Sequence, residues 1–340
     1  MPMMKDSSRM SSAESPPDRS PSSRAIIVHP LFKKRHPIYQ FFGSGTMFEK
    51  FHYVPIPGFP VPFVVQQNFE SSKEHLGSVL WHAGTSAARY IASYLNNLDK
   101  HEAEEEESKQ QTQETNEWKR PRQQRVLELG CGTAALASQC AALCGAQTFM
   151  TDLPEVLEWA KQNAKTNLAN QLAWKQRQDG QATSQPPPLD TSSLSPRNIG
   201  PNLSAMVLRW GETSDLVEIQ RALQEEEGDN NNNNNNNGGN PSSYFDIVVA
   251  AECLYATSDN PDLQSKLLET LKGLLSNGRT KVFFSYQLRT GDEKLFVEQV
   301  LPSVFPNYMV EEVNHRNDDS VMDTNVYSML WFRPKDLDEN

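Results

Sequence analysis

The chain has 340 residues with a formal net charge of −11, and 37 % of its residues are hydrophobic. This fraction lies below the roughly 45–50 % of globular proteins, a set that also counts glycine, so part of the chain is expected to lie outside any core. The acidic balance disfavours a nucleic-acid partner, since phosphate binding needs a basic face. No apolar run reaches signal-peptide length or the ~20 residues of a membrane span. We therefore expect a soluble cytoplasmic protein, which could also enter the nucleus, with no membrane partner.

The first 98 residues predict a tail, a hairpin and a helix. Residues 1–24 are rich in Ser and Pro and are expected to be disordered. Two short strands at 49–56 and 62–67 flank the turn-forming sequence PGFP, which predicts a β-hairpin ahead of the core. Apolar residues then recur at helical spacing, and this predicts an amphipathic helix over 81–98.

The segment 125–144 predicts a strand, a turn and a helix suited to a nucleotide. Residues 125–129 form a short buried strand, and Gly130 and Gly132 remove side chains where the chain must turn and a ligand must come close. The helix over 133–144 is rich in small residues, so it can pack close to a sheet while its N-terminal amides point toward the ligand.

The next strand, 147–151, ends at Asp152, an acid placed to accept hydrogen bonds from a ribose diol. The glycine pattern, completed by Ala135, fits a nicotinamide dinucleotide as well as S-adenosylmethionine. Glu128 favours the second ligand, because a carboxylate beside the turn suits an ammonium and a sulfonium and is poorly placed for a pyrophosphate. We therefore predict S-adenosylmethionine as the cofactor, with a dehydrogenase as an alternative.

The remaining chain alternates helices and strands. Helices are predicted from Pro154 and over 261–275 and 292–300, and strands over 205–209, 245–251, 281–286, 308–313 and 326–332. With the two central strands, this alternation predicts an α/β fold: a Rossmann-like, seven-stranded, mostly parallel sheet with helices on both faces. The last two strands have no helix between them, so one of them should run antiparallel. Ligands bind beyond the carboxyl ends of such strands. Four candidate residues lie there: Gly130, Asp152, Trp210 and Glu252.

Three segments of low apolar content interrupt this pattern, at 99–122, 176–201 and 224–243. The last contains an unbroken asparagine run, a low-complexity stretch that cannot form a packed core. We expect inserts there, within a single domain over 25–335 that is followed by a tail at 336–340.

The four cysteines, Cys131, Cys140, Cys144 and Cys253, show no metal-ligand spacing. They are expected to pack in the core of a protein from a reducing compartment, and no metal site is predicted.

Four segments of the chain together form a recognisable set of motifs. They are LGSVLWHAGTSAARYIASYL, VLELGCGTAAL with FMTDLPEVL, VLRWGE, and DIVVAAECLY, which ends in an acid-x-x-aromatic signature. In order and in strand-end placement, they resemble the seven-strand, class I S-adenosylmethionine-dependent methyltransferases of family 16, the protein-lysine methyltransferases. The resemblance covers roughly residues 48–332, apart from the inserts. Within the family, VLRWGE and FFSYQLRTGD are most similar to the enzymes that methylate the AAA ATPase valosin-containing protein, followed by those that methylate heat-shock chaperones.

The resemblance implies a role for each matching residue. Asp152 would hold the ribose, and the remaining cofactor contacts would come from Trp81, Gly130, Cys131, Gly132, Trp210 and Ala251. Glu252 and Tyr255 would face the methyl group and the incoming amine. Two positions depart from the family: Ala134 replaces a third glycine, and His82 replaces an acid.

Methyl transfer from a sulfonium is an in-line displacement, so the protein mainly aligns the reacting groups in a dry site. A lysine amine has a pKa near ~10.4 in water and must be neutral to attack. We expect Glu252 to hydrogen-bond this amine and Tyr255 to orient it. Alternatively, Glu252 caps a loop, Tyr255 is a core residue, and Asp152 caps the following helix.

The expected function is methyl transfer to a lysine side chain of a protein substrate such as an ATPase or a chaperone, by a monomeric enzyme. Two other functions stay open. One is a catalytically silent S-adenosylmethionine-binding module, and the other is a small-molecule methyltransferase.

Overall fold

The computed structural model describes residues 26–27, 36–37, 50–68, 76–110, 123–178, 197–230, 244–256, 261–288, 291–313 and 327–335. The chain divides into two compact units, Met1–Phe42 and Gly43–Asn340. In the first unit, β1 (Ile26–Ile27) pairs antiparallel with β2 (His36–Pro37). The predicted tails at 1–24 and 336–340 lie outside the described residues.

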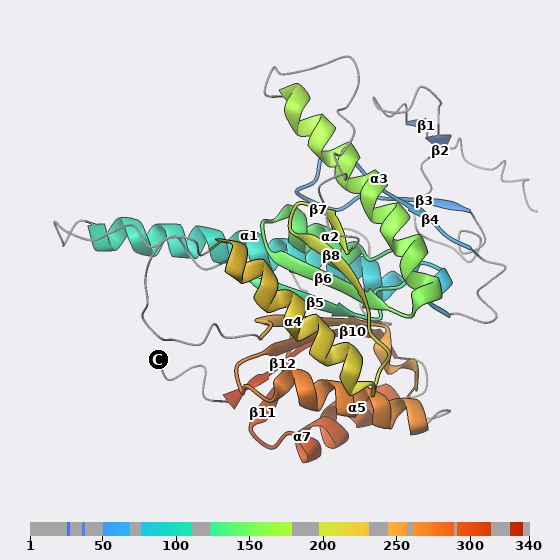
Figure 1. Cartoon of the computed structure of the whole chain (residues 1–340), viewed down its shortest axis with the longest axis vertical. Helices are drawn as coiled ribbons and strands as arrows, with labels where there is room; N and C mark the ends of the chain where they lie inside the picture. The colour runs from blue at the N-terminus through green and yellow to red at the C-terminus, as the bar shows by residue number, and fades with distance from the viewer. Residues whose placement is uncertain are drawn as a thin grey trace, which may run out of the picture. The chain divides into compact units, whose positions relative to one another are not determined.

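The second unit is built on an eight-stranded sheet (Figure 1). Its strands, in spatial order, are β11 (Tyr308–Glu312), β12 (Tyr327–Pro334), β10 (Lys281–Gln287), β9 (Ile247–Ala251), β5 (Arg125–Leu129), β6 (Gln147–Asp152), β8 (Leu203–Val207) and β7 (Asn198–Gly200). The five strands from β10 to β8 are parallel, and β12 runs antiparallel to both of its neighbours. The predicted α/β sheet with an antiparallel strand near the C-terminus is thus confirmed.

The eighth strand was not predicted from the sequence. β7 pairs antiparallel with β8 and lies at the end of the predicted insert 176–201. A three-residue edge strand is too short to show the alternation by which strands are identified.

Helices cover both faces of this sheet. They are α1 (His82–Gln110), α2 (Leu136–Leu143), α3 (Pro154–Gln178), α4 (Thr213–Asn230), α5 (Pro261–Leu275), α6 (Asp292–Leu295) and α7 (Leu301–Val304). Alternate residues of β5 point to opposite faces. Val126 packs with residues of α1 and α2, whereas Leu127 and Leu129 pack with residues of α4 and α5. The central strand is therefore buried on both sides, as a parallel sheet requires.

Several helices differ from the prediction, three of them in this part of the fold. α1 continues twelve residues past Leu98, because the segment that follows is composed of strong helix formers even though it lacks apolar residues. α4 was not predicted, although Leu216, Ile219 and Leu223 recur at helical spacing and are buried. The helix expected over 292–300 is divided into α6, a π-helical turn at Phe296–Val300, and α7. Pro302 explains the irregularity, because it has no N–H to donate to the preceding turn.

The predicted hairpin is present as β3 (Phe51–Val54) paired antiparallel with β4 (Phe63–Gln66). It lies beside α3 (Figure 1) and is connected to α1 through the short helix η3 (Leu76–Ser78).

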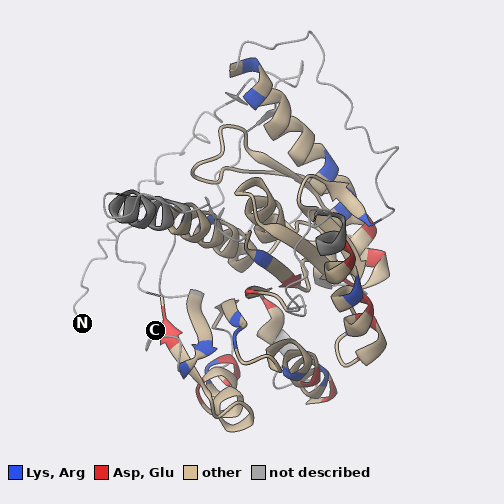
Figure 2. Cartoon of the chain, turned by 60° about the vertical axis from the view of Figure 1, so that its left-hand side comes forward, with Lys and Arg blue, Asp and Glu red and all other residues tan. Residues whose placement is uncertain are grey.

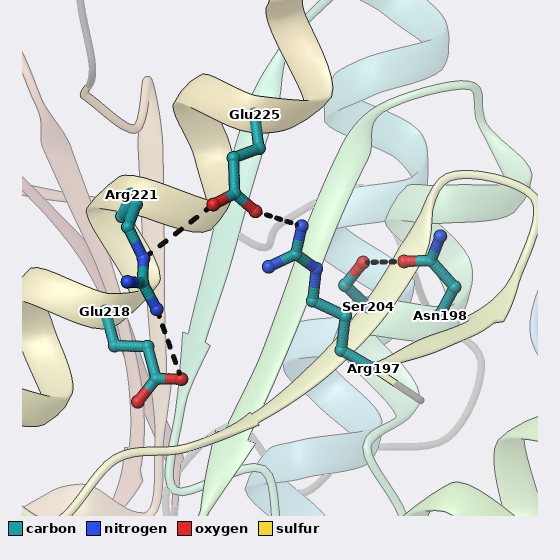
Figure 3. A network of polar contacts seen from close by, with 6 residues as sticks. All are labelled: Arg197, Asn198, Ser204, Glu218, Arg221 and Glu225. Carbon is teal, nitrogen blue, oxygen red and sulfur yellow. Dashed lines mark hydrogen bonds and ion pairs between the residues drawn. The ribbon is translucent and has the colours of Figure 1, made fainter. Parts of the chain in front are cut away.

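Charged side chains tie α4 to the β7 edge of the sheet (Figure 3). Arg197, just before β7, lies 2.7 Å from Glu225, and Arg221 lies 3.8 Å from both Glu225 and Glu218. These side chains are exposed, and such pairs contribute about 0–1 kcal/mol. The position of α4 is therefore set mainly by its buried apolar residues.

Acidic and basic residues both occur on the helices of the described part of the chain (Figure 2). α3 begins with Glu155 and ends with Lys175 and Arg177, an arrangement that favours the helix dipole. None of the helices in the described residues is long and apolar enough to cross a membrane.

Candidate active site

The glycine turn lies where the order of the sheet reverses. From the central strand β5 the chain proceeds to β6 and β8 on one side, and later to β9 and β10 on the other. The loops that leave β5 and β9 therefore diverge, and open α/β sheets bind their ligands at such a point, outside the carboxyl ends of the strands. We refer to this region as the candidate crevice. Gly130 follows β5 and Glu252 follows β9, so the two predicted halves of the site flank this switch point.

Both glycines of the turn are required by geometry. Gly130 has φ 58° and Gly132 has φ 60°, a region that side chains disfavour. A Cβ on Gly130 would lie 3.3 Å from Trp210 Cζ2 and 3.4 Å from Cys253 Sγ. The turn is therefore in close contact with the loops after β8 and β9. Sequence-distant residues of the predicted site thus come together here.

The helix after the turn starts later than predicted. α2 begins at Leu136 because Ala135 has φ 44°, a left-handed conformation that interrupts the helix. Ala134 is not among the residues with positive φ, so an alanine can take the place of the family's third glycine without backbone strain.

Asp152 shapes the turn from the end of β6. Its Oδ2 accepts a hydrogen bond from Gly132 N at 2.8 Å, and its Oδ1 accepts one from Leu153 N at 2.7 Å. Cys131 N donates to Thr151 O at 2.9 Å. An ionised carboxylate only accepts hydrogen bonds, which is the chemistry that a ribose diol would require of this residue. The predicted contact of Asp152 with the ribose stays a prediction.

Glu128 is turned into the start of α2. The residue is 2 % exposed, and its Oε2 accepts hydrogen bonds from the amide and the hydroxyl of Ser138. Burial raises the pKa of Glu128 to about 7; the nearby Asp152 adds to this, while the Ser138 bonds oppose it. The carboxylate thus supports the helix that follows the glycine turn. Its predicted contact with the cofactor ammonium stays a prediction.

The loop that carries Trp210 is held at two points. Asp215 accepts hydrogen bonds from the backbone amide and the guanidinium of Arg209, which hold the pKa of Asp215 below its usual value. Gly211 N donates to Thr270 Oγ1 of α5 at 2.8 Å. Trp210 is half-buried between these anchors, and its ring lies against Gly130.

Glu252 has an unusual backbone conformation. It is 7 % exposed and has φ 57°, which costs a residue with a side chain roughly 1–3 kcal/mol and is concentrated at functional sites. Glu252 N donates to Ser285 O at 2.7 Å, and Ser285 Oγ donates to Ala83 O at 2.9 Å. The next residue, Cys253, donates its thiol hydrogen to Leu129 O at 3.2 Å. The end of β9 is therefore joined to β5, β10 and the start of α1.

The remaining predicted residues lie at the end of β9 and at the start of α1. Ala251, the last residue of β9, is half-buried, as are Trp81 and His82 at the start of α1. Burial lowers the pKa of His82, so the imidazole is neutral near pH 7. The backbone of Tyr255 lies in the short helix η4 (Cys253–Ala256), while its side chain is outside the described residues.

Three residues next to the turn had no signal in the sequence. Gly77 lies over Gly132, since a Cβ on Gly132 would be 3.3 Å from Gly77 O. Thr133 N donates to that same carbonyl at 2.7 Å, and the Thr133 carbonyl accepts from Asn163 Nδ2 at 2.8 Å. These contacts join segments distant in the chain, so no local pattern could indicate them.

The cysteines lie in apolar surroundings as expected. Cys131, Cys140 and Cys253 are buried, and burial raises the pKa of each thiol well above its usual value. Within the described part of the chain, no group of three or more His, Cys, Asp or Glu residues could hold a metal ion.

The fold and the crevice define a nucleotide-binding α/β protein, and comparison with known proteins specifies its class. A family model described as lysine methyltransferase matches residues 65–186, from β4 through α3. This match confirms the resemblance to family 16 of the class I methyltransferases and identifies S-adenosylmethionine as the cofactor. The chain is thus an S-adenosylmethionine-dependent methyltransferase. A search of curated proteins found no match.

Solved structures of methyltransferases are similar at low identity. A TehB-like SAM-dependent methyltransferase from Corynebacterium glutamicum is 14 % identical, with a TM-score of 0.32, over 64 % of this chain and 83 % of that one. A SAM-dependent methyltransferase from Agrobacterium tumefaciens is 12 % identical, with a TM-score of 0.39, over 84 % and 71 %. The N-methyltransferase NodS from Bradyrhizobium japonicum, in complex with S-adenosylhomocysteine, is 12 % identical, with a TM-score of 0.31, over 62 % and 78 %.

Proposed function

We propose that this enzyme transfers the methyl group of S-adenosylmethionine to the side-chain amine of a lysine in a protein substrate. The family match supports the donor half of the proposal, because it covers the glycine turn and Asp152. The acceptor half, with Glu252 and Tyr255, lies outside the matched residues.

The observation that carries the acceptor half is Glu252. A buried carboxylate at the carboxyl end of β9 is retained there at the cost of a left-handed backbone. If this position served only to end the strand, Gly or Asn could adopt the same left-handed backbone at a lower cost than Glu. We infer that the side chain has a chemical role, and a carboxylate suits a cationic acceptor such as a lysine ammonium.

The residues of the crevice fit the cofactor. Asp152 offers acceptors for a ribose diol, the turn at Gly130 and Gly132 allows close approach, and the Trp210 ring forms an apolar wall. When bound, the cofactor supplies an electrophilic methyl group. Glu252 would accept a hydrogen bond from the lysine nitrogen and hold its lone pair toward that group. Because lysine is protonated at neutral pH, this carboxylate would also stabilise the ammonium until a proton is lost to water.

The test follows a labelled methyl group. The enzyme is incubated with S-adenosylmethionine labelled in the methyl group and with cell lysate, and labelled proteins are analysed by mass spectrometry. Methyl-lysine in a protein band supports the proposal. Label in a small soluble product would instead favour a small-molecule methyltransferase, and cofactor binding without transfer would favour a silent binding module.

Variants of Glu252 separate chemistry from folding. Glu252→Gln keeps the size of the side chain but not its charge, and Glu252→Gly relieves the strained φ. Both should bind the cofactor normally and lose transfer by 10²-fold or more, the usual range for a group that handles a proton. Glu212→Gln is the control, because Glu212 is an exposed acid after Trp210 at the same edge of the sheet. Wild-type transfer by both Glu252 variants would exclude this residue from the acceptor site.

The proposed partner is a protein, with an ATPase or a chaperone as the first candidates, and the proposed state is a cytoplasmic monomer that could also enter the nucleus. The support is the resemblance of the segments VLRWGE and FFSYQLRTGD to methyltransferases of such substrates. Identification of the labelled band tests the substrate.

A further inference from the structure

Three amide side chains of α3 bind the edge of β4. Asn163 Oδ1 accepts from Gln66 N at 2.9 Å, and its Nδ2 donates to Gln66 O at 2.8 Å. Asn167 makes the same pair of hydrogen bonds with Val64: its Oδ1 accepts from Val64 N at 2.7 Å, and its Nδ2 donates to Val64 O at 3.0 Å. Gln171 Nε2 donates to Val61 O at 2.5 Å. The three side chains are buried and take the place of a neighbouring strand; we call them the amide ladder.

The spacing of the ladder has a simple origin. Four helical residues rise about 6 Å, and two strand residues advance about 6.6–6.8 Å. Side chains at i and i+4 can therefore each bind both backbone groups of alternate strand residues. The next alternate residue toward the N-terminus is Pro62, which lies opposite Gln171 in this series and has no N–H to donate. Gln171 therefore donates to the carbonyl of Val61 instead.

Asn163 differs from Asn167 in one respect. Its Nδ2 also donates to Thr133 O at 2.8 Å, directly after Gly132. Thr133 is fully buried, its Oγ1 donates to Gln66 O at 3.1 Å, and its amide donates to Gly77 O at 2.7 Å. Gly132 N donates to Asp152, so hydrogen bonds, together with the peptide bond between Gly132 and Thr133, connect β4 to the acid that is predicted to hold the ribose.

We propose that Asn163 is a positioning residue for S-adenosylmethionine binding. Asn163 holds Thr133, and thereby the glycine turn, against Gln66 of β4 and Gly77 of η3. The turn then has its binding conformation before the cofactor arrives, and this preorganisation raises affinity because less order has to be created on binding. The inference rests on cofactor binding and is independent of which acceptor is methylated.

The matched control is Asn167. Asn163→Ala and Asn167→Ala each remove two hydrogen bonds to β4, but only the first also releases Thr133. Both variants should lower the Tm of the cofactor-free enzyme, Asn163→Ala by more because it also loses the hydrogen bond to Thr133 O. Titration calorimetry with S-adenosylhomocysteine should give a Kd about tenfold higher for Asn163→Ala, the effect of roughly one buried hydrogen bond. For Asn167→Ala, the Kd should stay within about twofold of wild type.

Two further variants keep the test decisive if Asn163→Ala does not fold. Asn163→Asp keeps the acceptor for Gln66 N and loses the donor to Thr133, and Thr133→Val removes the hydroxyl link to Gln66. Both should raise the Kd and reduce the Tm increase that S-adenosylhomocysteine produces.

Equal changes of the Kd in the Asn163 and Asn167 variants, or no change in either, would overturn the inference and leave the methyltransferase assignment intact. A wild-type enzyme that binds neither S-adenosylmethionine nor S-adenosylhomocysteine would overturn both.

Discussion

Replacement of Glu128 by glutamine should make the enzyme more stable at alkaline pH. Glu128 is 2 % exposed, and its carboxylate is held by Ser138 at the start of α2. Glutamine keeps an oxygen that can accept from the Ser138 amide but carries no charge. The variant therefore removes the cost of ionising a buried group while it preserves the contact with the helix.

The magnitude follows from the pKa. The value rises from 4.5 in the unfolded chain to about 7 in the folded protein, so the folded state holds its proton more tightly. The stability that this proton contributes is fully present below pH 4.5 and is lost as the pH rises through 7. At about 1.4 kcal/mol for each pH unit between the two values, the loss reaches about 3 kcal/mol above pH 8.

The assay is urea unfolding of both proteins at several pH values between 4 and 8.5. The difference in the free energy of unfolding, variant minus wild type, should be constant below pH 4.5 and should grow in favour of the variant up to pH 8. Any loss from the changed hydrogen bonding of the amide shifts this difference by a constant amount, so the test is its dependence on pH. A pH-independent difference, or one that favours wild type increasingly at high pH, would refute the buried, proton-binding carboxyl.

Two further substitutions test the glycine turn. Gly130→Ala places a methyl group 3.3 Å from Trp210 and 3.4 Å from Cys253 at φ 58°; we expect it to abolish cofactor binding in calorimetry, and normal binding would contradict the required close approach. Ala135→Gly relieves a left-handed φ of 44° but also removes a fully buried methyl group. The relief of about 1–2 kcal/mol offsets the lost burial and the added freedom of the unfolded chain, so the free energy of unfolding in urea titrations should change by less than about 1 kcal/mol. A loss of about 2 kcal/mol would show that the left-handed backbone is not strained.

The sequence predicted those parts of the fold whose residues are buried on regular faces. The bounds of β5 and α5 agree with the prediction, because a strand buried on both faces and an amphipathic helix ended by Asn277-Gly278 both leave clear local patterns. The sequence did not reveal β7, which is buried but too short to show an alternating pattern, or the continuation of α1, whose sequence has almost no apolar residues. Pattern analysis detects apolar residues that recur over several turns or strand positions, and neither segment has them.

The candidate site, too, could be predicted only in part from the sequence. Residues at strand ends, such as Gly130, Asp152 and Glu252, could be placed at one edge because parallel strands share their direction. The contacts that hold them could not be placed, since Thr133 is joined by hydrogen bonds to Gly77 and to Asn163, which lie 56 and 30 residues away in the chain. Nor could the sequence show that the Glu128 carboxylate turns into α2, because both faces of β5 are buried.

The two sides of the crevice are held by different interactions. Mutations on the two sides should therefore have different effects on cofactor binding and on methyl transfer. On the donor side, Asp152 and Thr133 are fixed by several hydrogen bonds each, so the shape of the turn is shared among many groups. On the proposed acceptor side, Glu252 combines a buried carboxylate with a strained backbone in a single residue. Loss of one donor-side bond should therefore weaken cofactor binding by a limited factor. Loss of the Glu252 carboxylate should leave binding intact and remove transfer, because no other described residue of the crevice is both acidic and placed at the end of β9.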